Sequence, residues 1–169
     1  MVDAAAASVL VPIVADRQTG IESLLLTKRT ETLPTHKGQV SFPGGYREPH
    51  DADLLATALR EAEEEVGIAP TDVRILGPLD SVTAGGRVGI RPFVAVLDGP
   101  YPFRPSADEV ERLLQLPFDR LMEEGLKPVT VKVGTFSIVS EGIVVDGELV
   151  WGATARMLRD LWELLTSRA

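Results

Sequence analysis

Cysteine is absent from all 169 residues of this chain, and histidine occurs only twice. The sequence therefore excludes disulfide bonds, catalytic thiolates and zinc sites built on sulfur. A chain of this kind suits a reducing compartment, and we expect the cytoplasm. Residues 1–15 lack the cationic start of a signal peptide, and their apolar run contains Pro12 and is short for a membrane span. We expect no contact with a membrane.

Basic residues are also scarce. There are 17 Lys and Arg against 25 Asp and Glu, which gives a formal net charge of −8. A nucleic-acid-binding surface would need a basic footprint, so we expect no nucleic-acid partner. The acidic excess is concentrated in residues 44–68, where seven acidic and two basic side chains leave −5 of the −8. This segment is either a solvated acidic face or a place that holds metal.

The order of expected elements is strands, one central helix, further strands and a terminal helix. With 44% hydrophobic residues, a chain of this length can bury one core, and we expect a single domain over residues 1–169. The order predicts an α/β fold with helices on both faces of a mixed sheet. Strands are expected at 8–15, 21–28, 38–42, 73–79 and 90–97, two or three more within 129–150, and helices at 53–66, 118–124 and 153–165. Residues 108–116 suit either a helix or a strand.

The central helix has sequence signals at both ends. Asp53 is a good N-cap residue, and Gly67 supplies a C-terminal stop. Between them, apolar residues recur at the spacing of one helical face. Just upstream, the glycine turn at 42–45, with the sequence F-P-G-G, is expected to end the short strand at 38–42.

Three carboxylates fall on one face of this helix. At about 100° per residue, Glu61, Glu64 and Glu65 stand at i, i+3 and i+4, whereas Glu63 points to the opposite side. Like charges at these spacings destabilise a helix by roughly 0.2–0.5 kcal/mol per pair, and a bound divalent cation would reverse that sign. The three glutamates therefore predict a site for Mg²⁺ or Mn²⁺, which prefer oxygen ligands. For the glutamates alone, the alternative is a solvated helix face.

The stretch at 60–68, R-E-A-E-E-E-V-G-I, resembles the second half of the Nudix hydrolase motif, G-x5-E-x7-R-E-U-x-E-E-x-G-U, in which U is apolar. One extra residue lies between the glycine turn and this stretch, and Ala52 stands where the motif has its first glutamate. Asp51 or Asp53 is a candidate for that role, with helix capping as the alternative for Asp53. The resemblance implies a Nudix-type α/β/α sandwich with a mixed β-sheet and a metal-dependent hydrolase.

The resemblance extends upstream to the coenzyme A pyrophosphatases. Their additional signature is similar to L-L-T-x-R-[SA]-x3-R-x3-G-x3-F-P-G-G, and residues 25–29, Gly38 and residues 42–45 match it in register. The stretch W-G-A-T-A-R at 151–156 also resembles the end of this subgroup. The likeness therefore covers most of the chain.

The Nudix resemblance implies a set of metal ligands. Glu61 and Glu65 are expected to hold the ion, and Glu64 is expected to bind it directly or through a water molecule. The carbonyl oxygen of Gly44 is a candidate main-chain ligand, because the family uses one at this turn and glycine allows a close approach of the backbone.

Further catalytic roles follow from the same resemblance. Arg60 is expected to orient a carboxylate, either Glu61 or Asp51, and not to contact the substrate. The candidates for the general base are Glu64 and Glu109. For Glu109, an exposed position at a sheet edge is the alternative.

Substrate binding is expected to depend on cations near the glycine turn. Arg29, Lys37 and Arg87 are the candidates for phosphate contacts, with an ordinary surface position as the alternative for the first two. Gly45 completes the set at the turn. Phe42 is expected to stack on the base, with Tyr46 as a second choice and a core position as the alternative for Phe42.

The two motifs together imply hydrolysis of the pyrophosphate of coenzyme A or its thioesters to 3′,5′-ADP and 4′-phosphopantetheine or its acyl derivative. One alternative is cleavage of ADP-ribose or a dinucleoside polyphosphate, because Pro34 stands where the coenzyme A signature has an arginine. Either His36 or Lys37 would have to replace it. A second alternative is a non-catalytic Nudix module that senses a nucleotide or binds a partner. The expected ligand is a small nucleotide, and a homodimer is a candidate assembly.

Overall fold

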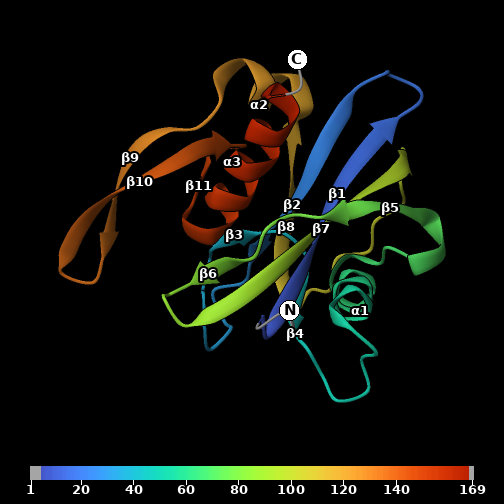
Figure 1. Cartoon of the computed structure of the whole chain (residues 1–169), viewed down its shortest axis with the longest axis horizontal. Coiled ribbons are helices and arrows are strands. Elements are labelled where there is room, and N and C mark those ends of the chain that lie inside the picture. Colours follow the sequence, from blue (N-terminus) through green and yellow to red (C-terminus); the bar gives the residue numbers. More distant parts are fainter. Residues whose placement is uncertain (1–4, 168–169) are drawn as a thin grey trace.

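The structure is a computed structural model and describes residues 5–167 (Figure 1). In chain order the elements are β1 (Ala7–Asp16), β2 (Glu22–Arg29), β3 (Val40–Ser41), β4 (Gly44–Tyr46), α1 (Leu54–Val66), the 3₁₀ helix η1 (Pro70–Asp72), β5 (Val73–Pro78), β6 (Val82–Ala84), β7 (Val88–Gly99), β8 (Val110–Pro117), α2 (Phe118–Glu124), β9 (Lys127–Val133), β10 (Phe136–Val145), β11 (Glu148–Trp151) and α3 (Gly152–Thr166).

The large sheet is mixed and is built around β1. Its main strand order is β3-β2-β1-β7-β5, with β4 paired to β1, β6 to β7 and β8 to β2. Strands β1 and β7 are parallel along their whole overlap, whereas the other pairs are antiparallel. The first eight residues of β1 are all buried, which agrees with a strand that is covered on both faces.

Helices cover both faces of this sheet (Figure 1). Helix α1 packs on one face over a core cluster that includes Leu10, Leu25 and Leu97. On the other face, α3 contributes Leu158 and Leu161 to a larger cluster. The predicted α/β class with a mixed sheet between helices is confirmed.

Strands β9, β10 and β11 form a separate antiparallel sheet, in the order β11-β10-β9. The sequence indicated two or three strands within 129–150, and the structure has three, but the sequence did not indicate that they form a sheet of their own. Strand β11 leads directly into α3, and the β9–β10 hairpin projects away from the rest of the molecule (Figure 1). It carries exposed apolar side chains such as Phe136, beside the turn, and Val139, in the middle of β10.

Most elements lie where the sequence placed them, with three differences near the site. The ambiguous segment at 108–116 is a strand, β8, which pairs with β2. The loop around 85–87 is the turn of a β6–β7 hairpin. The glycine turn also continues as a strand, because Gly44 and Gly45 pair with the start of β1 as part of β4. Among helices within residues 5–167, none is long and apolar enough to cross a membrane.

Candidate active site

The ends of α1 determine where its glutamates lie. The Asp53 side chain accepts a hydrogen bond from the Ala56 N–H at 2.8 Å, as expected of an N-cap. At the other end, Gly67 adopts a left-handed conformation with φ of 74°, and its N–H bonds to the last turn. The predicted helix is therefore confirmed, and Glu61 and Glu65 lie in its last turns.

The glycine pair brings the backbone of β4 against α1. In the β1–β4 register, Ser8 is opposite Gly45 and Val9 is opposite Gly44. A Cβ atom placed on Gly45 would lie 2.5 Å from Oε1 of Glu61. A side chain at this position would displace the Glu61 carboxylate from the β4 backbone.

Arg60, in α1, forms hydrogen bonds both with the loop before the helix and with a neighbouring glutamate of the helix. Its Nε and Nη2 donate to the two carboxylate oxygens of Asp51, both at 2.9 Å, and its Nη1 donates to Glu61 at 3.0 Å. Asp51 also accepts hydrogen bonds from the Thr57 hydroxyl and the Glu48 N–H, each at 2.9 Å. The hydrogen bonds from Arg60, followed by the one from Glu48, hold the pKa of this buried carboxyl well below its usual range.

These contacts decide between two sequence candidates. Asp51 contacts Arg60, the arginine of the motif, whereas Asp53 caps the helix. The sequence anticipated Arg60 with either Glu61 or Asp51, and the structure pairs it with both. Thr57 was not anticipated, because a threonine inside a helix gives no indication of such a contact.

Glu64 turns toward Arg60. Both of its carboxylate oxygens lie 3.4 Å from Nη1 of Arg60, and its side chain is 55% exposed. Within residues 5–167, no three acidic or imidazole side chains converge closely enough, as they are oriented, to hold a metal ion. The expected meeting of Glu61, Glu64 and Glu65 is thus only partly present, because Glu64 is drawn to the arginine.

Glu65 is buried in a negative environment. Desolvation, followed by the charges of Glu61 and Glu109, raises the pKa of its carboxyl to about 8, against a smaller opposing effect of Arg29 and a main-chain hydrogen bond from Gly44. Desolvation also raises the pKa of Glu61, although hydrogen bonding to Arg60 opposes it. The site therefore gathers carboxylates whose ionised form lacks adequate compensation.

Glu109 lies in the loop directly before β8, far from α1 in the sequence but near its glutamates in space. The Ser106 N–H donates to the carbonyl oxygen of Glu65 at 2.8 Å, and the Thr30 N–H donates to the carbonyl oxygen of Glu109 at 3.1 Å. Glu109 is half-buried, and its charge raises the pKa of both Glu61 and Glu65 after the effect of desolvation. It directly precedes β8, which pairs only with β2 among the described strands, so Glu109 is partly covered at a sheet edge.

The three candidate cations differ in position. Arg29, at the end of β2, is close enough to Glu65 to oppose the rise of its pKa, although desolvation dominates that shift. Its Nε is buried and has no hydrogen-bond partner within residues 5–167. Lys37 is exposed in the loop between β2 and β3, and Arg87 is exposed in the β6–β7 turn. Only Arg29 is thus placed directly against the carboxylates.

The aromatic residues require a correction. Phe42 is 2% exposed and belongs to the core cluster beneath α3, so its ring cannot stack on a nucleotide. The sequence did not reveal its orientation, because the residue borders a turn. Tyr46, the second choice, is 61% exposed, and its carbonyl oxygen accepts a hydrogen bond from Arg60 at 3.2 Å. His36 is exposed in its loop.

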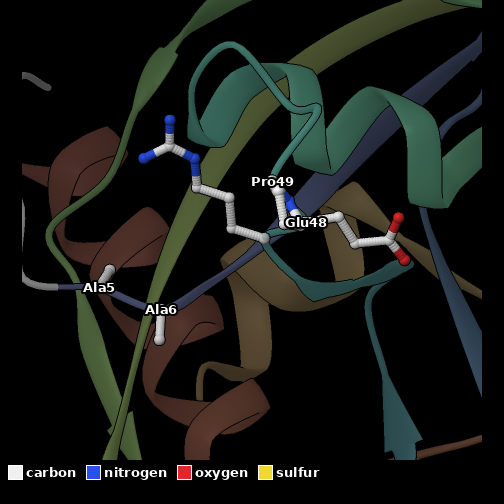
Figure 2. A pocket seen from close by; sticks show the side chains of 5 residues that line it. Ala5, Ala6, Glu48 and Pro49 are labelled. Atoms are coloured by element: carbon white, nitrogen blue, oxygen red, sulfur yellow. The ribbon is translucent and has the colours of Figure 1, made fainter.

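A shallow pocket of about 390 Å³ borders the loop between β4 and α1. It is lined by Ala5, Ala6, Arg47, Glu48 and Pro49. Figure 2 shows the Glu48 side chain directed away from Ala5 and Ala6. The glutamates of α1 do not line it, and it is distinct from the carboxylate cluster.

Comparisons with known proteins identify the family. The sequence model of the NUDIX domain matches residues 4–129. The uncharacterized Nudix hydrolase NudL of Escherichia coli (strain SMS-3-5 / SECEC) is 39% identical over 159 residues, which cover 92% of this chain and 80% of the relative. NudL of Salmonella paratyphi B is 40% identical over the same shares of the two chains.

Solved structures show the same fold. The Nudix hydrolase RenU of M. smegmatis has a TM-score of 0.66 at 16% identity, with 98% of this chain and 88% of that one covered. The C. elegans Ap4A hydrolase has a TM-score of 0.57 at 19% identity, with 69% and 83% covered. This chain belongs to the Nudix family. It is a Nudix hydrolase, whose substrates contain a pyrophosphate linkage.

Proposed function

We propose that this protein hydrolyses the pyrophosphate bond of coenzyme A or its thioesters, giving 3′,5′-ADP and 4′-phosphopantetheine or its acyl derivative. The observation that carries the proposal is the match of residues 25–29, Gly38 and residues 42–45 to the coenzyme A signature. The fold supports the proposal because both ends of this signature lie near Glu65. Arg29, from its first part, and Gly44, from its last part, both oppose the rise in the pKa of the Glu65 carboxyl.

The donor set suits Mg²⁺ or Mn²⁺. Glu61, Glu65 and the Gly44 carbonyl would hold the ion, and Glu64 would contribute after turning from Arg60 or through water. Burial of Glu65 without a cation opposes its ionisation, and a divalent ion removes that penalty. When bound, the ion supplies charge neutralisation at the phosphates and lowers the pKa of a coordinated water.

The chain's own residues have separate tasks in the proposed reaction. Arg60 holds Glu61 against Gly45 through its hydrogen bond. Glu109 accepts the proton of the attacking water as general base. Its half-buried position among the carboxylates favours it over Glu64, which is exposed and paired with the arginine.

Phosphate binding falls first to Arg29, because its buried Nε lacks an acceptor within the described part of the chain. Lys37 and Arg87 lie on exposed segments and contribute the outer phosphate contacts. Tyr46, exposed beside the Arg60 contact, replaces Phe42 as the residue that stacks on the base.

A substrate screen tests the proposal. Purified protein with Mg²⁺ or Mn²⁺ is incubated with coenzyme A, an acyl-coenzyme A, ADP-ribose and a dinucleoside tetraphosphate, and the products are separated by chromatography. We expect the fastest turnover with coenzyme A or its thioester, yielding 3′,5′-ADP. Faster turnover of ADP-ribose or of the dinucleotide would overturn the substrate while leaving the reaction class intact.

Faster turnover of ADP-ribose or of the dinucleotide has a specific basis. Among the neighbours in fold are an Ap4A hydrolase and the NUDIX domain of Shewanella oneidensis NrtR complexed with ADP ribose, the latter at a TM-score of 0.50. If no substrate is turned over and Glu65→Gln still binds the nucleotide as tightly as the wild type, the non-catalytic sensor would be the better description.

A matched pair of variants tests the phosphate contact. Arg29→Met should raise KM for coenzyme A by about tenfold, because one charge-assisted phosphate contact is lost. Arg17→Met removes a cation of the β1–β2 turn that pairs with Asp98 at the exposed surface, and it should leave KM unchanged. An equal effect of both variants would exclude a specific role for Arg29.

A further inference from the structure

The last turn of α1 is bonded to a segment from much further along the chain. Between β7 and β8, residues 100–106 form neither helix nor strand, and we call them the strap. The Arg104 N–H donates to the carbonyl oxygen of Val66 at 2.9 Å. The Ser106 N–H donates to the carbonyl oxygen of Glu65 at 2.8 Å. The strap therefore bonds directly to the turn that carries Glu65.

These two bonds replace those that a longer helix would form. In a continued α-helix, the carbonyl oxygen of Glu65 would accept from Ala69, and that of Val66 would accept from the residue after it. The helix ends instead at Gly67, and the residue after Ala69 is Pro70, which has no N–H to donate. The strap supplies the two missing donors.

Tyr101 completes the exchange of partners. Its hydroxyl accepts a hydrogen bond at 3.0 Å from the Ala69 N–H, the donor that the helix no longer uses. The same hydroxyl donates to the carboxylate of Asp72, in η1, at 2.7 Å. The ring lies 5.1 Å from that of Phe103, and both rings pack against the core cluster beneath α1. The Tyr101 hydroxyl thus joins the strap to the loop that follows α1.

The strap lies in close contact with the end of the helix. A Cβ atom placed on Gly67 would be 3.0 Å from the Cβ of Arg104. At the downstream end of the strap, the Ser106 carbonyl oxygen accepts from the N–H groups of Glu109 and Val110, at 3.1 and 2.8 Å. The strap is therefore held at the start of β8 on one side and by Tyr101 on the other.

We propose that Tyr101 is a positioning residue for Glu65: by bonding to Ala69 and Asp72, its hydroxyl holds the strap against the last turn of α1 and so fixes the backbone that carries this glutamate. The inference rests on the proposed function for the role of Glu65 as a metal ligand, but the hydrogen bonds that it describes can be tested without metal or substrate.

The affinity for Mn²⁺ tests the consequence for the site. Tyr101→Phe keeps the ring and removes only the hydroxyl. Titration of the substrate-free protein, with free Mn²⁺ measured by electron paramagnetic resonance, should show a Kd raised by about tenfold, as for other residues that orient metal ligands. At saturating Mn²⁺, kcat should return to the wild-type value, because every ligand is still present. A wild-type Kd would overturn the proposal, even if Tm fell.

Amide hydrogen exchange in the metal-free protein tests the geometry. In Tyr101→Phe, the Ser106 amide should exchange about two- to tenfold faster, as expected when one hydrogen bond that holds the strap is lost. Unchanged exchange at Ser106 would overturn the positioning role. Faster exchange in a protein that neither binds Mn²⁺ nor turns over substrate would sustain that role and reject the proposed function alone.

The control removes a hydroxyl from the end of another helix. The Thr166 hydroxyl donates to the carbonyl oxygen of Trp162 at 2.8 Å, in the last turn of α3 on the other face of the sheet. Thr166→Val should change neither the exchange at Ser106 nor the Kd for Mn²⁺. Equal changes in this variant and in Tyr101→Phe would show a general loosening of the protein and would contradict the proposal.

A second variant covers the case in which Tyr101→Phe fails to fold. Asp72 is exposed, and Asp72→Ala removes one partner of the Tyr101 hydroxyl while the Ala69 bond remains. The Kd for Mn²⁺ should rise by about threefold, with faster exchange at Ser106. Asp72→Asn keeps an acceptor oxygen and should restore both values. Wild-type behaviour of Asp72→Ala would also contradict the proposal.

Discussion

Asp51 and Glu65 are both buried carboxylates, 6% and 5% exposed, yet their surroundings have opposite effects. Arg60, Thr57 and a main-chain N–H satisfy Asp51, and hydrogen bonding to Arg60 is the main cause of its lowered pKa. Glu65 faces other carboxylates, and desolvation is the main cause of its raised pKa.

The difference separates two roles. A buried charge with all its partners in the protein stabilises the structure that surrounds it. A buried carboxyl without them is a costly feature of the folded chain unless a cation binds. Asp51 therefore belongs to the framework that orients Arg60, whereas Glu65 belongs to the part of the site that takes the ion.

The variant Glu65→Gln tests the role of Glu65 in metal binding and has the largest expected effect. Turnover with Mg²⁺ should fall by about 10³-fold, because several kcal/mol of metal-based transition-state stabilisation is lost. The metal-free variant should melt at a higher temperature than the wild type, since a neutral side chain is easier to bury. Glu63→Gln, on the exposed side of α1, should change neither kcat nor Tm. Retention of most activity in Glu65→Gln would contradict the assignment.

The second test removes the framework. Asp51→Asn removes the negative charge that accepts two hydrogen bonds from Arg60. The kcat should fall by about 10- to 100-fold, as for other residues that orient metal ligands. Unlike Glu65→Gln, it should also lower Tm in the absence of metal. Asp98→Asn, which loses only an exposed pair with Arg17, is the control and should behave as wild type. A higher Tm in Asp51→Asn would remove the contrast between the two acids.

The third test uses pH. The pKa of Glu65 is raised from its ordinary 4.5 to about 8, so between these values the folded state binds a proton that the unfolded state lacks. The contribution of Glu65 to stability is therefore largest below about pH 4.5 and is lost as pH rises through about 8. Asp51 acts in the opposite sense, since its stabilisation is lost as the solution becomes acidic.

Thermal melting can follow this effect. Chelator should lower Tm more at pH 8 than at pH 5, because the ion binds the ionised carboxylate, roughly as linkage predicts. In Glu65→Gln, the decrease in Tm caused by chelator should differ less between pH 8 and pH 5. The same Tm with and without chelator at the higher pH would indicate that no ion binds there.

The smallest expected effect concerns Asp53. Asp53→Ala should cost about 1 kcal/mol of unfolding free energy through loss of the N-cap, with kcat unchanged. Urea unfolding gives the stability, and Asp53→Asn should restore it, since asparagine also caps. A large loss of activity in Asp53→Ala would return this residue to the catalytic framework.

Much of the fold could be predicted because local signals and tertiary packing agree. Helix α1 begins after Asp53 and ends before Gly67, as its caps require. The pairing of Gly44 and Gly45 with β1 could not be predicted, since glycine has little strand preference and the partner lies more than thirty residues away. Alternation within 129–150 indicated strands, but it carries no information about which sheet they join.

The site was predictable only where helical spacing fixes geometry. The spacing placed Glu61 and Glu65 together and Glu63 apart. It also puts Glu64 at i+4 from Arg60, so that the two can pair, but it does not decide between this pairing and convergence with the other glutamates. The loop that carries Glu109 is held beside the site by main-chain hydrogen bonds to Thr30 and Glu65, and such contacts have no distinct sequence signature. Contacts between distant segments therefore account for most of what the sequence did not show.

The projecting β9–β10 hairpin has a practical consequence. Its turn, at Gly134 and Thr135, is exposed, and it belongs to neither α1 nor β4, which carry the candidate metal ligands. A fluorescent label attached there through an introduced cysteine would be the only thiol adduct on this chain. Ligand occupancy could then be followed by a single-site optical signal, without any alteration of the catalytic carboxylates.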